Sequence, residues 1–512
     1  MRLESRKNTK KNFASGFICR IVFLIFQFIT RTVIIHQLGG EYSGLDSLFT
    51  SILQVLNLTE LGVGNALVFS MYKPIAHDDY RTLCALMQIY KTLYRIIGFI
   101  ILAMGLLIIP FVPQLISGGV PETINVYVIY CLNLSTTAVS YWLFSYRNSL
   151  LIAYQRSSVG NAVALGIELL KFVAQLCILF SLKSYYLYLT VTLFTTILNN
   201  IVTAWITKKL YPDINPVGNL PKQKRRTIFI QIKDIFTAKL GGVITNSCDT
   251  IVVSAFLGLA ELTKYSNYYY IVSLIRGFMA LIYQSTRAGI GNKLVLDNPE
   301  KKYRDFLSFS YICNFVIAVC TSAFLCGIQP FMLLWVKNQW MYPDSVAILF
   351  AIYLYIHESA SVLITYKDAA GIWHNDRFRP LIVSVINLLM NIVMVRYIGI
   401  YGIVLSTILS FMFVGIPWLL SNTFRFIFNR PCKEYVLLTL RNTLLTTISC
   451  ITAIKLCSLL TFTGIFSFLI PVIIATITTL LLFGLGTLKS KDASEAFRIV
   501  TGMMKGSKNE KH

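Results

Sequence analysis

Long apolar segments follow one another along the chain, and this succession constrains the fold more than any single motif. An α-helix needs about 20 predominantly apolar residues to cross a bilayer, and about fourteen segments of the chain meet that requirement. Charged residues make up only 13% of the sequence, against roughly 25% in a soluble protein. The sequence therefore predicts an all-α polytopic membrane protein, with spans near residues 13–36, 44–71, 92–116, 122–146, 157–181, 185–207, 236–258, 262–289, 305–328, 344–366, 379–397, 400–424, 434–457 and 463–487.

The lysines and arginines are concentrated in alternate connections between the spans. If the N-terminus is cytoplasmic, the connections on that side hold most of them, including Lys208, Lys209 and the basic cluster at 222–226. This asymmetry follows the positive-inside rule and predicts that both termini are cytoplasmic. The net charge of +23 is spread over many small loops, so we expect no nucleic-acid partner. The first apolar run is too long for a signal peptide and is expected to be retained.

The eleven cysteines and five histidines show no spacing typical of a metal site. The sequence also lacks an Asp-x-Asp motif and a glycine-rich phosphate loop of catalytic type. We therefore expect no metal, no cofactor and no catalytic residue, which means that the protein is not an enzyme.

Polar residues inside the apolar spans point to a functional surface. Arg20, Gln27 and Arg31 lie on one face of the first span, within about 40° of one another at 100° per residue. A charge at membrane depth is costly, so it usually faces a bundle interior or a water-filled cavity. Two arginines on one face therefore predict a cavity that binds an anion.

Three further spans carry polar faces of the same kind. The second span has polar or small residues at steps of three or four, namely Asp46, Thr50, Gln54, Asn57, Glu60 and Gly64. The seventh and eighth spans contribute Lys239, Asn246, Asp249 and Thr250, and Ser273, Arg276, Gln284 and Arg287, respectively. We expect these faces and that of the first span to meet between two lobes.

The longest polar connection, 208–233, divides the first six spans from the next six and suggests an internal repeat. An offset of 219 residues aligns Leu38-Gly39 with Leu257-Gly258, and it pairs Arg20 with Lys239, Gln27 with Asn246, Asn57 with Arg276 and Asn65 with Gln284. We predict an N-terminal six-helix lobe at 1–207, a basic cytoplasmic linker at 208–235, a C-terminal six-helix lobe at 236–424, and two extra helices with a basic cytoplasmic tail at 425–512.

Three motifs near the start of the chain carry a resemblance to a known family. They are Leu-Gly-Gly-Glu-Tyr-Ser-Gly-Leu at 38–45, Glu-Leu-Gly-Val-Gly-Asn-Ala at 60–66 and Tyr-Lys-Pro at 72–74. The segment resembles the beginning of polysaccharide-biosynthesis flippases, which move lipid-linked O-antigen or capsule oligosaccharides. These flippases belong to the multidrug/oligosaccharidyl-lipid/polysaccharide exporter superfamily.

The resemblance implies two six-helix lobes in a V around a central cationic cavity, in the inner (plasma) membrane of a bacterium. It implies that the protein moves an undecaprenyl-diphosphate-linked oligosaccharide to the outer leaflet by alternating access, and we expect it to work as a monomer among membrane lipids. The last two spans resemble the extra helices of lipid II flippases, which form a groove for the lipid tail. The expected substrate-binding residues are Arg20, Arg31, Asn57, Lys239, Arg276 and Arg287; H⁺ or Na⁺ is expected as a coupling ion at Glu60 or Asp249.

Each of these residues also has a purely structural interpretation. Arg20 and Arg31 could pair with Glu60 or Asp46 across a helix interface, and the two acids could simply neutralise neighbouring arginines. Other polar groups in the spans are expected to be structural: Glu168 and Lys171 as an intrahelical pair, and His357, Glu358, Asn387 and Asn391 as interhelical hydrogen-bonding groups.

Two other functions compete with the flippase. A cation-coupled multidrug exporter of the same superfamily should have a cavity dominated by carboxylates, whereas the buried bases here match or outnumber the acids. A membrane glycan polymerase or glycosyltransferase needs a large outer loop, and the longest outer stretch, 329–344, is too short for one. The sequence identifies neither the glycan nor the driving ion.

Overall fold

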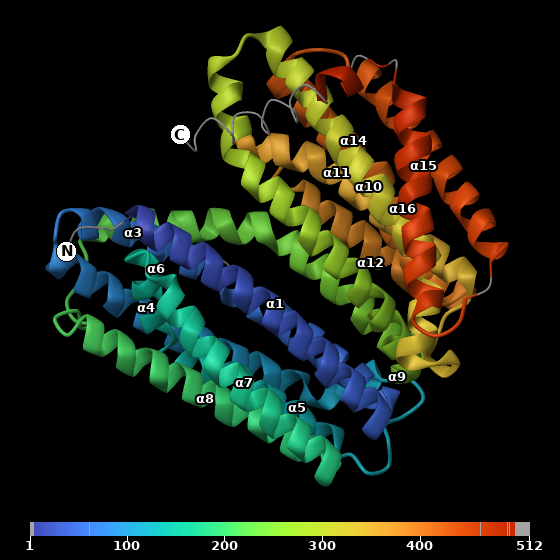
Figure 1. Ribbon diagram of the computed structural model, residues 1–512. Helices are drawn as coiled ribbons and strands as arrows, with labels where there is room; N and C mark the ends of the chain where they lie inside the picture. The colour runs from blue at the N-terminus through green and yellow to red at the C-terminus, as the bar shows by residue number, and fades with distance from the viewer. Residues whose placement is uncertain (1–4, 61, 461, 489, 491, 497–512) are drawn as a thin grey trace. The chain divides into compact units, whose positions relative to one another are not determined.

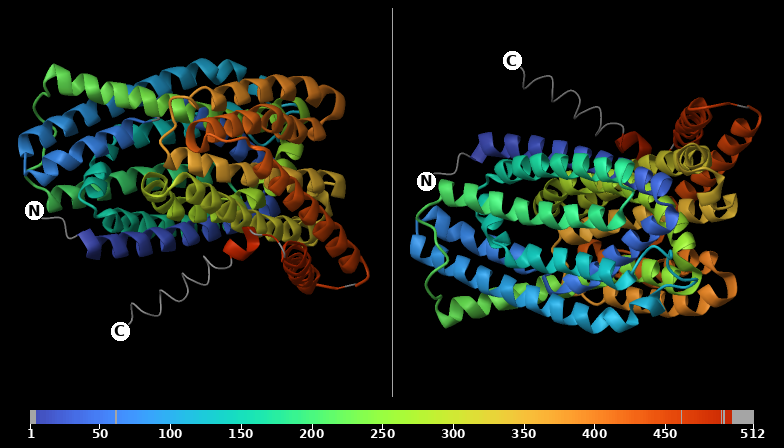
Figure 2. Two further views of the ribbon diagram at one scale, coloured as in Figure 1. Left: turned by 90° about the horizontal axis from the view of Figure 1, so that it is seen from above. Right: turned by 90° about the horizontal axis from the view of Figure 1, so that it is seen from below.

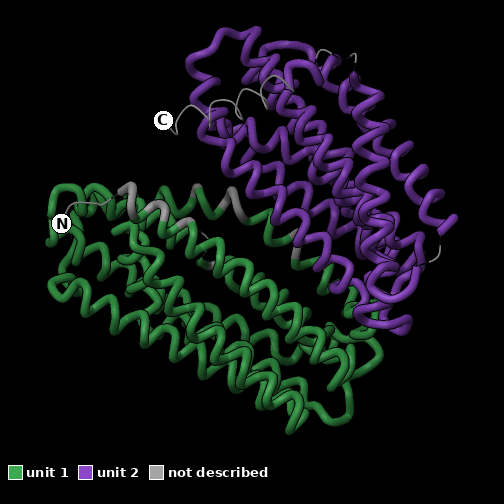
Figure 3. Tube along the Cα trace, in the orientation of Figure 1, with its two compact units in different colours: residues 1–263 green, residues 264–512 purple. Residues whose placement is uncertain are grey.

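The computed structural model of the chain describes residues 5–60, 62–460, 462–488, 490 and 492–496, and all the regular structure in these residues is helical (Figure 1). The chain divides into two compact units, residues 1–263 and 264–512 (Figure 3). The predicted linker at 208–235 and the predicted start of the second lobe at 236 both lie in unit 1. The predicted lobe boundaries stay a prediction.

Unit 1 holds eight α-helices, three short 3-10 helices and the first part of a ninth α-helix among its described residues. In order they are α1 (Ser5–Gln37), α2 (Gly40–Leu56), η1 (Asn57–Glu60), α3 (Val63–Ala76), α4 (Tyr80–Ile108), η2 (Ile109–Leu115), α5 (Val126–Trp142), η3 (Ser145–Arg147), α6 (Asn148–Ala153), α7 (Ser157–Ser181), α8 (Tyr185–Leu210) and α9 (Lys222–Leu296), which continues into unit 2.

Unit 2 contains the end of α9 and the remaining helices, two of which, η5 and η6, are short π-helices. They are α10 (Pro299–Val336), η4 (Asn338–Trp340), α11 (Asp344–Ala369), α12 (Arg379–Ile398), α13 (Ile400–Ser410), η5 (Phe411–Gly415), α14 (Ile416–Thr423), η6 (Phe424–Phe428), α15 (Lys433–Ser458) and α16 (Phe466–Thr487).

Several helices begin at a residue whose side chain satisfies a free backbone N–H group. The side chains of Asp79, Asn125, Ser184 and Asn298 accept hydrogen bonds from backbone N–H groups at the starts of α4, α5, α8 and α10. The first four N–H groups of a helix have no partner within it, so these polar caps fix the helix starts.

Eleven helical segments of the described chain are long and apolar enough to cross a membrane. One of them, Leu240–Leu296, contains two predicted spans, 236–258 and 262–289, for most of their length. The predicted spans 44–71 and 122–146 correspond to shorter helices, α2 with α3 and α5. The prediction of an all-α polytopic membrane protein is confirmed.

Two glycines interrupt the helices at the positions that the predicted repeat aligns. Gly39, between α1 and α2, has φ 116° and ψ 159°, and Gly258, inside α9, has φ 87° and ψ 177°. This region of backbone space is open almost only to glycine. The same helix break therefore occurs twice at the predicted offset of 219 residues.

The last two helices pack into unit 2. In Figures 1 and 2, α15 and α16 lie side by side, and both contact α10. Cys326 of α10, Ala453 of α15 and Ala475 of α16 form a small buried cluster among them. Small side chains allow close helix approach in a membrane, which explains the contact. The main core of unit 2 is aromatic and surrounds Phe306, whose ring contacts Tyr366, Phe424, Phe428 and Tyr435.

Candidate substrate and ion sites

Arg276 of α9 lies in a polar cluster with three residues of α11. Its Nε donates to Glu358 Oε1 at 3.2 Å, and its Nη1 donates to the Tyr353 hydroxyl at 2.8 Å. Its Nη2 lies 3.2 and 3.1 Å from the two ring nitrogens of His357. The guanidinium carbon also lies 5.6 Å from the centre of the Tyr353 ring. All three guanidinium nitrogens are therefore engaged, and Glu358 balances the charge.

The two ends of this ion pair differ in accessibility. The Arg276 side chain is 22% exposed, whereas that of Glu358 is only 5% exposed. The His357 side chain is 25% exposed, and its ring stacks on Phe411 of the π-helix η5, with centroids 4.8 Å apart. An incoming group can therefore reach Arg276 and His357, while the carboxylate lies behind them.

Arg287, one of the expected substrate-binding residues, lies in a different network. Its Nη2 is 3.2 Å from Asp368 Oδ2, and Asp368 also pairs with Lys367 at 2.7 Å. Lys367 continues the network to Asp376 at 3.1 Å, which Arg379 holds with two hydrogen bonds of 2.8 and 2.9 Å. Arg287 thus joins the end of α9 to the α11–α12 connection, and the structure does not bring it into the Arg276 cluster.

Glu60, in η1, is held by tyrosine hydroxyls. Tyr94 of α4 donates to its Oε1 and Tyr141 of α5 to its Oε2, each at 2.5 Å. Tyr141 also lies 3.3 Å from Asn57 Oδ1, and Tyr90 donates to the Tyr94 hydroxyl at 3.2 Å. Among the described residues, no basic side chain forms an ion pair with Glu60, which removes the expectation that it neutralises an arginine.

The two arginines of the first span have different surroundings. Arg20 is exposed on α1. Arg31 is half-buried, its Nη1 donates to the Ser47 hydroxyl at 3.4 Å, and it interacts electrostatically with Asp46 of α2. The structural interpretation, a pairing across the α1–α2 interface, therefore describes the surroundings of Arg31.

Asp249 and Lys239 lie on the first part of α9, in unit 1. Asp249 is buried, at 6% exposure. The neighbouring Ser247 donates to Gln54 of α2 at 3.3 Å, which places the Asp249 segment of α9 beside α2. The side chain of Lys239 lies outside the described residues.

Sequence reasoning missed the tyrosines around Glu60 and the full role of His357. Tyr90, Tyr94 and Tyr141 sit in apolar surroundings where tyrosine is an ordinary core residue, and no periodicity links α4 and α5 to η1. The expected hydrogen bonding of Asn387 and Asn391 is confirmed, because Asn387 donates to Thr407 at 3.0 Å and Asn391 accepts from Ser406. The Glu168–Lys171 pair is also present, at 2.6 Å.

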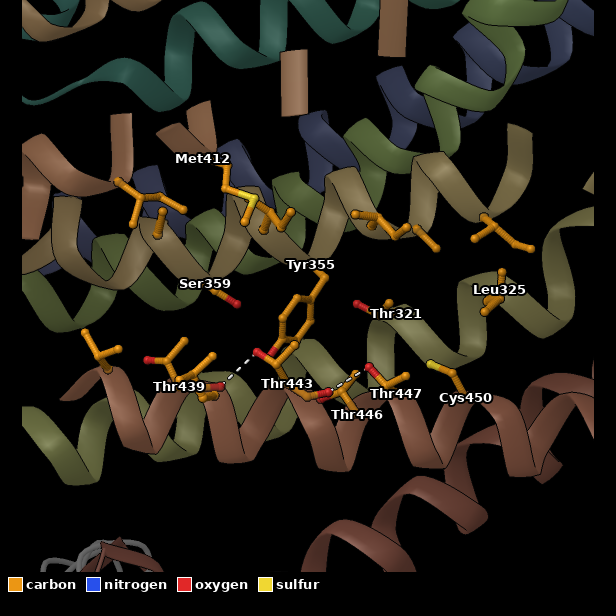
Figure 4. Close-up of a pocket in the computed structure, with 18 of the residues that line it drawn as sticks. Thr321, Leu325, Tyr355, Ser359, Met412, Thr439, Thr443, Thr446, Thr447 and Cys450 are labelled. Atoms are coloured by element: carbon orange, nitrogen blue, oxygen red, sulfur yellow. Dashed lines mark hydrogen bonds between the residues drawn. The ribbon is translucent and has the colours of Figure 1, made fainter. Parts of the chain in front are cut away.

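A pocket of about 680 Å³ lies in unit 2, between α11 and α15 and closed by α10 and α14 (Figure 4). Apolar side chains such as Leu325, Ile352 and Met412 dominate its lining. The Tyr355 hydroxyl is hydrogen-bonded to Thr443 at 3.0 Å. At 100° per residue, Tyr355 and Ile352 face away from Tyr353 and His357, so α11 separates the pocket from the Arg276 cluster.

Comparison with known proteins places the fold in a class of membrane transporter. No protein-family model matches the chain. It is 23% identical over 443 residues to a Yersinia pseudotuberculosis protein named "Putative O-antigen export protein", which covers 82% of this chain and 97% of that protein.

Solved structures share the fold at low sequence identity. The lipid II flippase MurJ, in an inward closed conformation, has a TM-score of 0.63 at 15% identity and covers 92% of this chain and 98% of its own. An outward-facing multidrug resistance transporter of the MATE family and MOP superfamily has a TM-score of 0.54 at 14% identity, over 82% and 95%. The MATE transporter VcmN of Vibrio cholerae has a TM-score of 0.53 at 14% identity, over 83% and 99%.

The chain is thus a polytopic helical membrane protein with a transporter fold. More particularly, it has the fold of the MOP superfamily and is similar in sequence to an O-antigen exporter, which confirms the resemblance predicted from its motifs.

Proposed function

We propose that this protein is a flippase that moves a lipid-linked oligosaccharide, carried on undecaprenyl diphosphate, from the cytoplasmic to the outer leaflet by alternating access. The observation that carries the proposal is Arg276, a partly accessible arginine on a membrane-spanning helix of the MurJ-like fold. A guanidinium fork matches the oxygens of a diphosphate and can bind two of them at once.

The apolar pocket of unit 2 supports a role for the lipid tail. Its lining is apolar, and its few hydroxyls include those of Tyr355 and Thr443, which are hydrogen-bonded to each other. Burying a prenyl chain there gains about 25 cal/mol per Å² of apolar surface removed from water, although a tail leaving lipid gains less. The helix α15, one of the two expected extra helices, provides much of this lining.

Two driving forces fit the described groups. Glu60 is proposed as the coupling site for H⁺ or Na⁺, with Asp249 as the second candidate. Independently, a membrane potential that is negative inside favours outward movement of an anionic head group by about 2.3 kcal/mol per charge per 100 mV. We place the protein in the inner membrane of a bacterium, with both termini cytoplasmic as the loop charges predict.

Reconstitution tests the proposal. The full chain in liposomes is given a fluorescent undecaprenyl-diphosphate glycan, and the fraction open to an impermeant quencher is followed with time. We expect faster loss of leaflet asymmetry than in protein-free vesicles. Folded protein that leaves the asymmetry unchanged contradicts a flippase. Export of a cationic drug by the same vesicles instead indicates the multidrug exporter.

A further inference from the structure

We propose that His357 is a proton site coupled to anion binding at Arg276, such that the anion and a proton bind together. The inference rests on the proposed function, since it assigns the diphosphate to Arg276. It arises from the contact between a guanidinium nitrogen and the imidazole ring, at 3.1 and 3.2 Å from the ring nitrogens.

The hydrogen-bonding capacity of the two groups fixes the charge of His357 in this arrangement. A guanidinium has five donors and no acceptor, and a protonated imidazole likewise has only donors. The contact with Nη2 of Arg276 therefore requires a neutral ring that offers an unprotonated nitrogen. Protonation turns the contact into a repulsion between two cations and must break it.

A second partner for the protonated ring is already in place. Nδ1 of His357 lies 3.7 Å from Glu358 Oε1, the same oxygen that accepts from Nε of Arg276. A positive His357 can therefore take over the carboxylate. Arg276 then loses the contact with the ring and shares its counter-ion, and its fork becomes available to an external anion.

The charges of the cluster change accordingly. In the observed arrangement Arg276 and Glu358 balance each other, which limits the cost of holding charge in the membrane. With His357 protonated, the cluster gains one positive charge on the two side chains that are 22% and 25% exposed, while the 5% exposed carboxylate stays behind them. An anion then meets two cations, and by linkage its binding favours the protonated ring.

The other groups around His357 leave it as the group that changes charge near neutral pH. From α11 it faces Tyr353 and Glu358, from α9 Arg276, and from η5 the uncharged ring of Phe411. Arg379 of α12 acts on it at longer range. On the α10 side, Cys313 and Cys320 interact with Glu358. Histidine is the side chain whose ordinary titration lies between about pH 5 and 8.

The test measures the affinity of the detergent-solubilised full chain for a fluorescent undecaprenyl-diphosphate sugar at several values between about pH 5 and about pH 8. A diphosphate esterified at both ends lacks the terminal ionisation near about 6 of a phosphate monoester, so the charge of the probe is constant. We expect affinity to rise as pH falls, by up to about tenfold per unit where one proton is taken up. His357→Gln should bind weakly at every pH, and the exposed His374→Gln should keep the wild-type profile.

A second measurement on the wild-type chain avoids dependence on the variant. In weakly buffered solution with a pH indicator, binding of the probe should draw protons from the medium. Affinity that is the same at every pH, without proton uptake, overturns the coupling and leaves the flippase proposal standing. A pH dependence that survives in His357→Gln overturns it as well. Absence of binding at every pH overturns both proposals.

Discussion

Arg276 and Glu358, 82 residues apart in the sequence, form an ion pair at 3.2 Å between α9 and α11. The pair connects two helices of one unit and leaves the arginine more accessible than the acid. This asymmetry is the basis for an anion site, because a substrate phosphate can replace part of the arginine's contacts without having to displace a solvated carboxylate.

The identity of the cation at position 276 should matter as well as its charge. Arg276→Lys keeps the charge but loses the planar fork, and Arg276→Gln loses both. We expect affinity for the lipid-diphosphate sugar to fall in both variants, by about tenfold or more for glutamine, which corresponds to about 1.4 kcal/mol. Binding titration measures this, with the exposed loop variant Arg377→Gln as the control. Equal affinity in all four proteins excludes Arg276 from the site.

The acid should be needed for stability. Glu358→Gln leaves Arg276 without its counter-ion, and removal of one partner from a buried pair costs about 3–5 kcal/mol in soluble proteins. We expect a lower unfolding temperature in detergent, and partial recovery in the double variant Arg276→Gln/Glu358→Gln, because the two residues interact directly. Additive losses in the double variant would show that the pair makes no net contribution.

Glu60 offers a test of ion coupling. Glutamine at position 60 can still accept hydrogen bonds from Tyr94 or Tyr141 but cannot gain or lose a proton. We expect Glu60→Gln to transport at a rate that no longer responds to an imposed pH gradient, while substrate binding is kept. Transport into proteoliposomes with and without the gradient measures this, with the exposed Glu122→Gln as the control. A wild-type protein that ignores the gradient makes the membrane potential the simpler driving force.

Two isoleucines of α15 form a matched pair for the pocket. Ile451 lines it and Ile448 does not, although both are exposed to a similar extent, 51% and 44%. We expect Ile451→Trp to weaken binding of a long-chain lipid diphosphate and to leave a short-chain analogue unaffected. Ile448→Trp should bind both like the wild type. If the two variants behave alike, the pocket does not hold the tail.

Close packing at Gly44 should be intolerant of a methyl group. A Cβ atom there would lie 2.5 Å from the Leu259 carbonyl oxygen, which belongs to the backbone. We expect Gly44→Ala to lose about 1–3 kcal/mol of stability, as overpacked sites do. Gly166→Ala, where a Cβ meets nothing within 4 Å, is the control. Thermal unfolding of the two variants in one detergent compares them, and equal stability would show that the α2–α9 contact relaxes freely.

Much of the fold was predictable from the sequence because span length and loop charge are local properties. The helix breaks at Gly39 and Gly258 were also foreshadowed by the Leu-Gly pairs that anchored the repeat. The partners of polar residues were not predictable in the same way. The stripe on the second span identified Glu60 as unusual, but its tyrosine partners come from α4 and α5, and no local pattern connects them. For Arg287, helical periodicity gave the helix face, whereas its pairing depends on the α11–α12 connection.

The most direct test of the account is the rate at which a fluorescent undecaprenyl-diphosphate glycan crosses the bilayer of proteoliposomes containing wild type, Arg276→Gln or Arg377→Gln at equal amounts of folded protein. The account predicts rapid crossing for wild type and Arg377→Gln, and a rate close to that of protein-free vesicles for Arg276→Gln. Crossing by Arg276→Gln at the wild-type rate would contradict it.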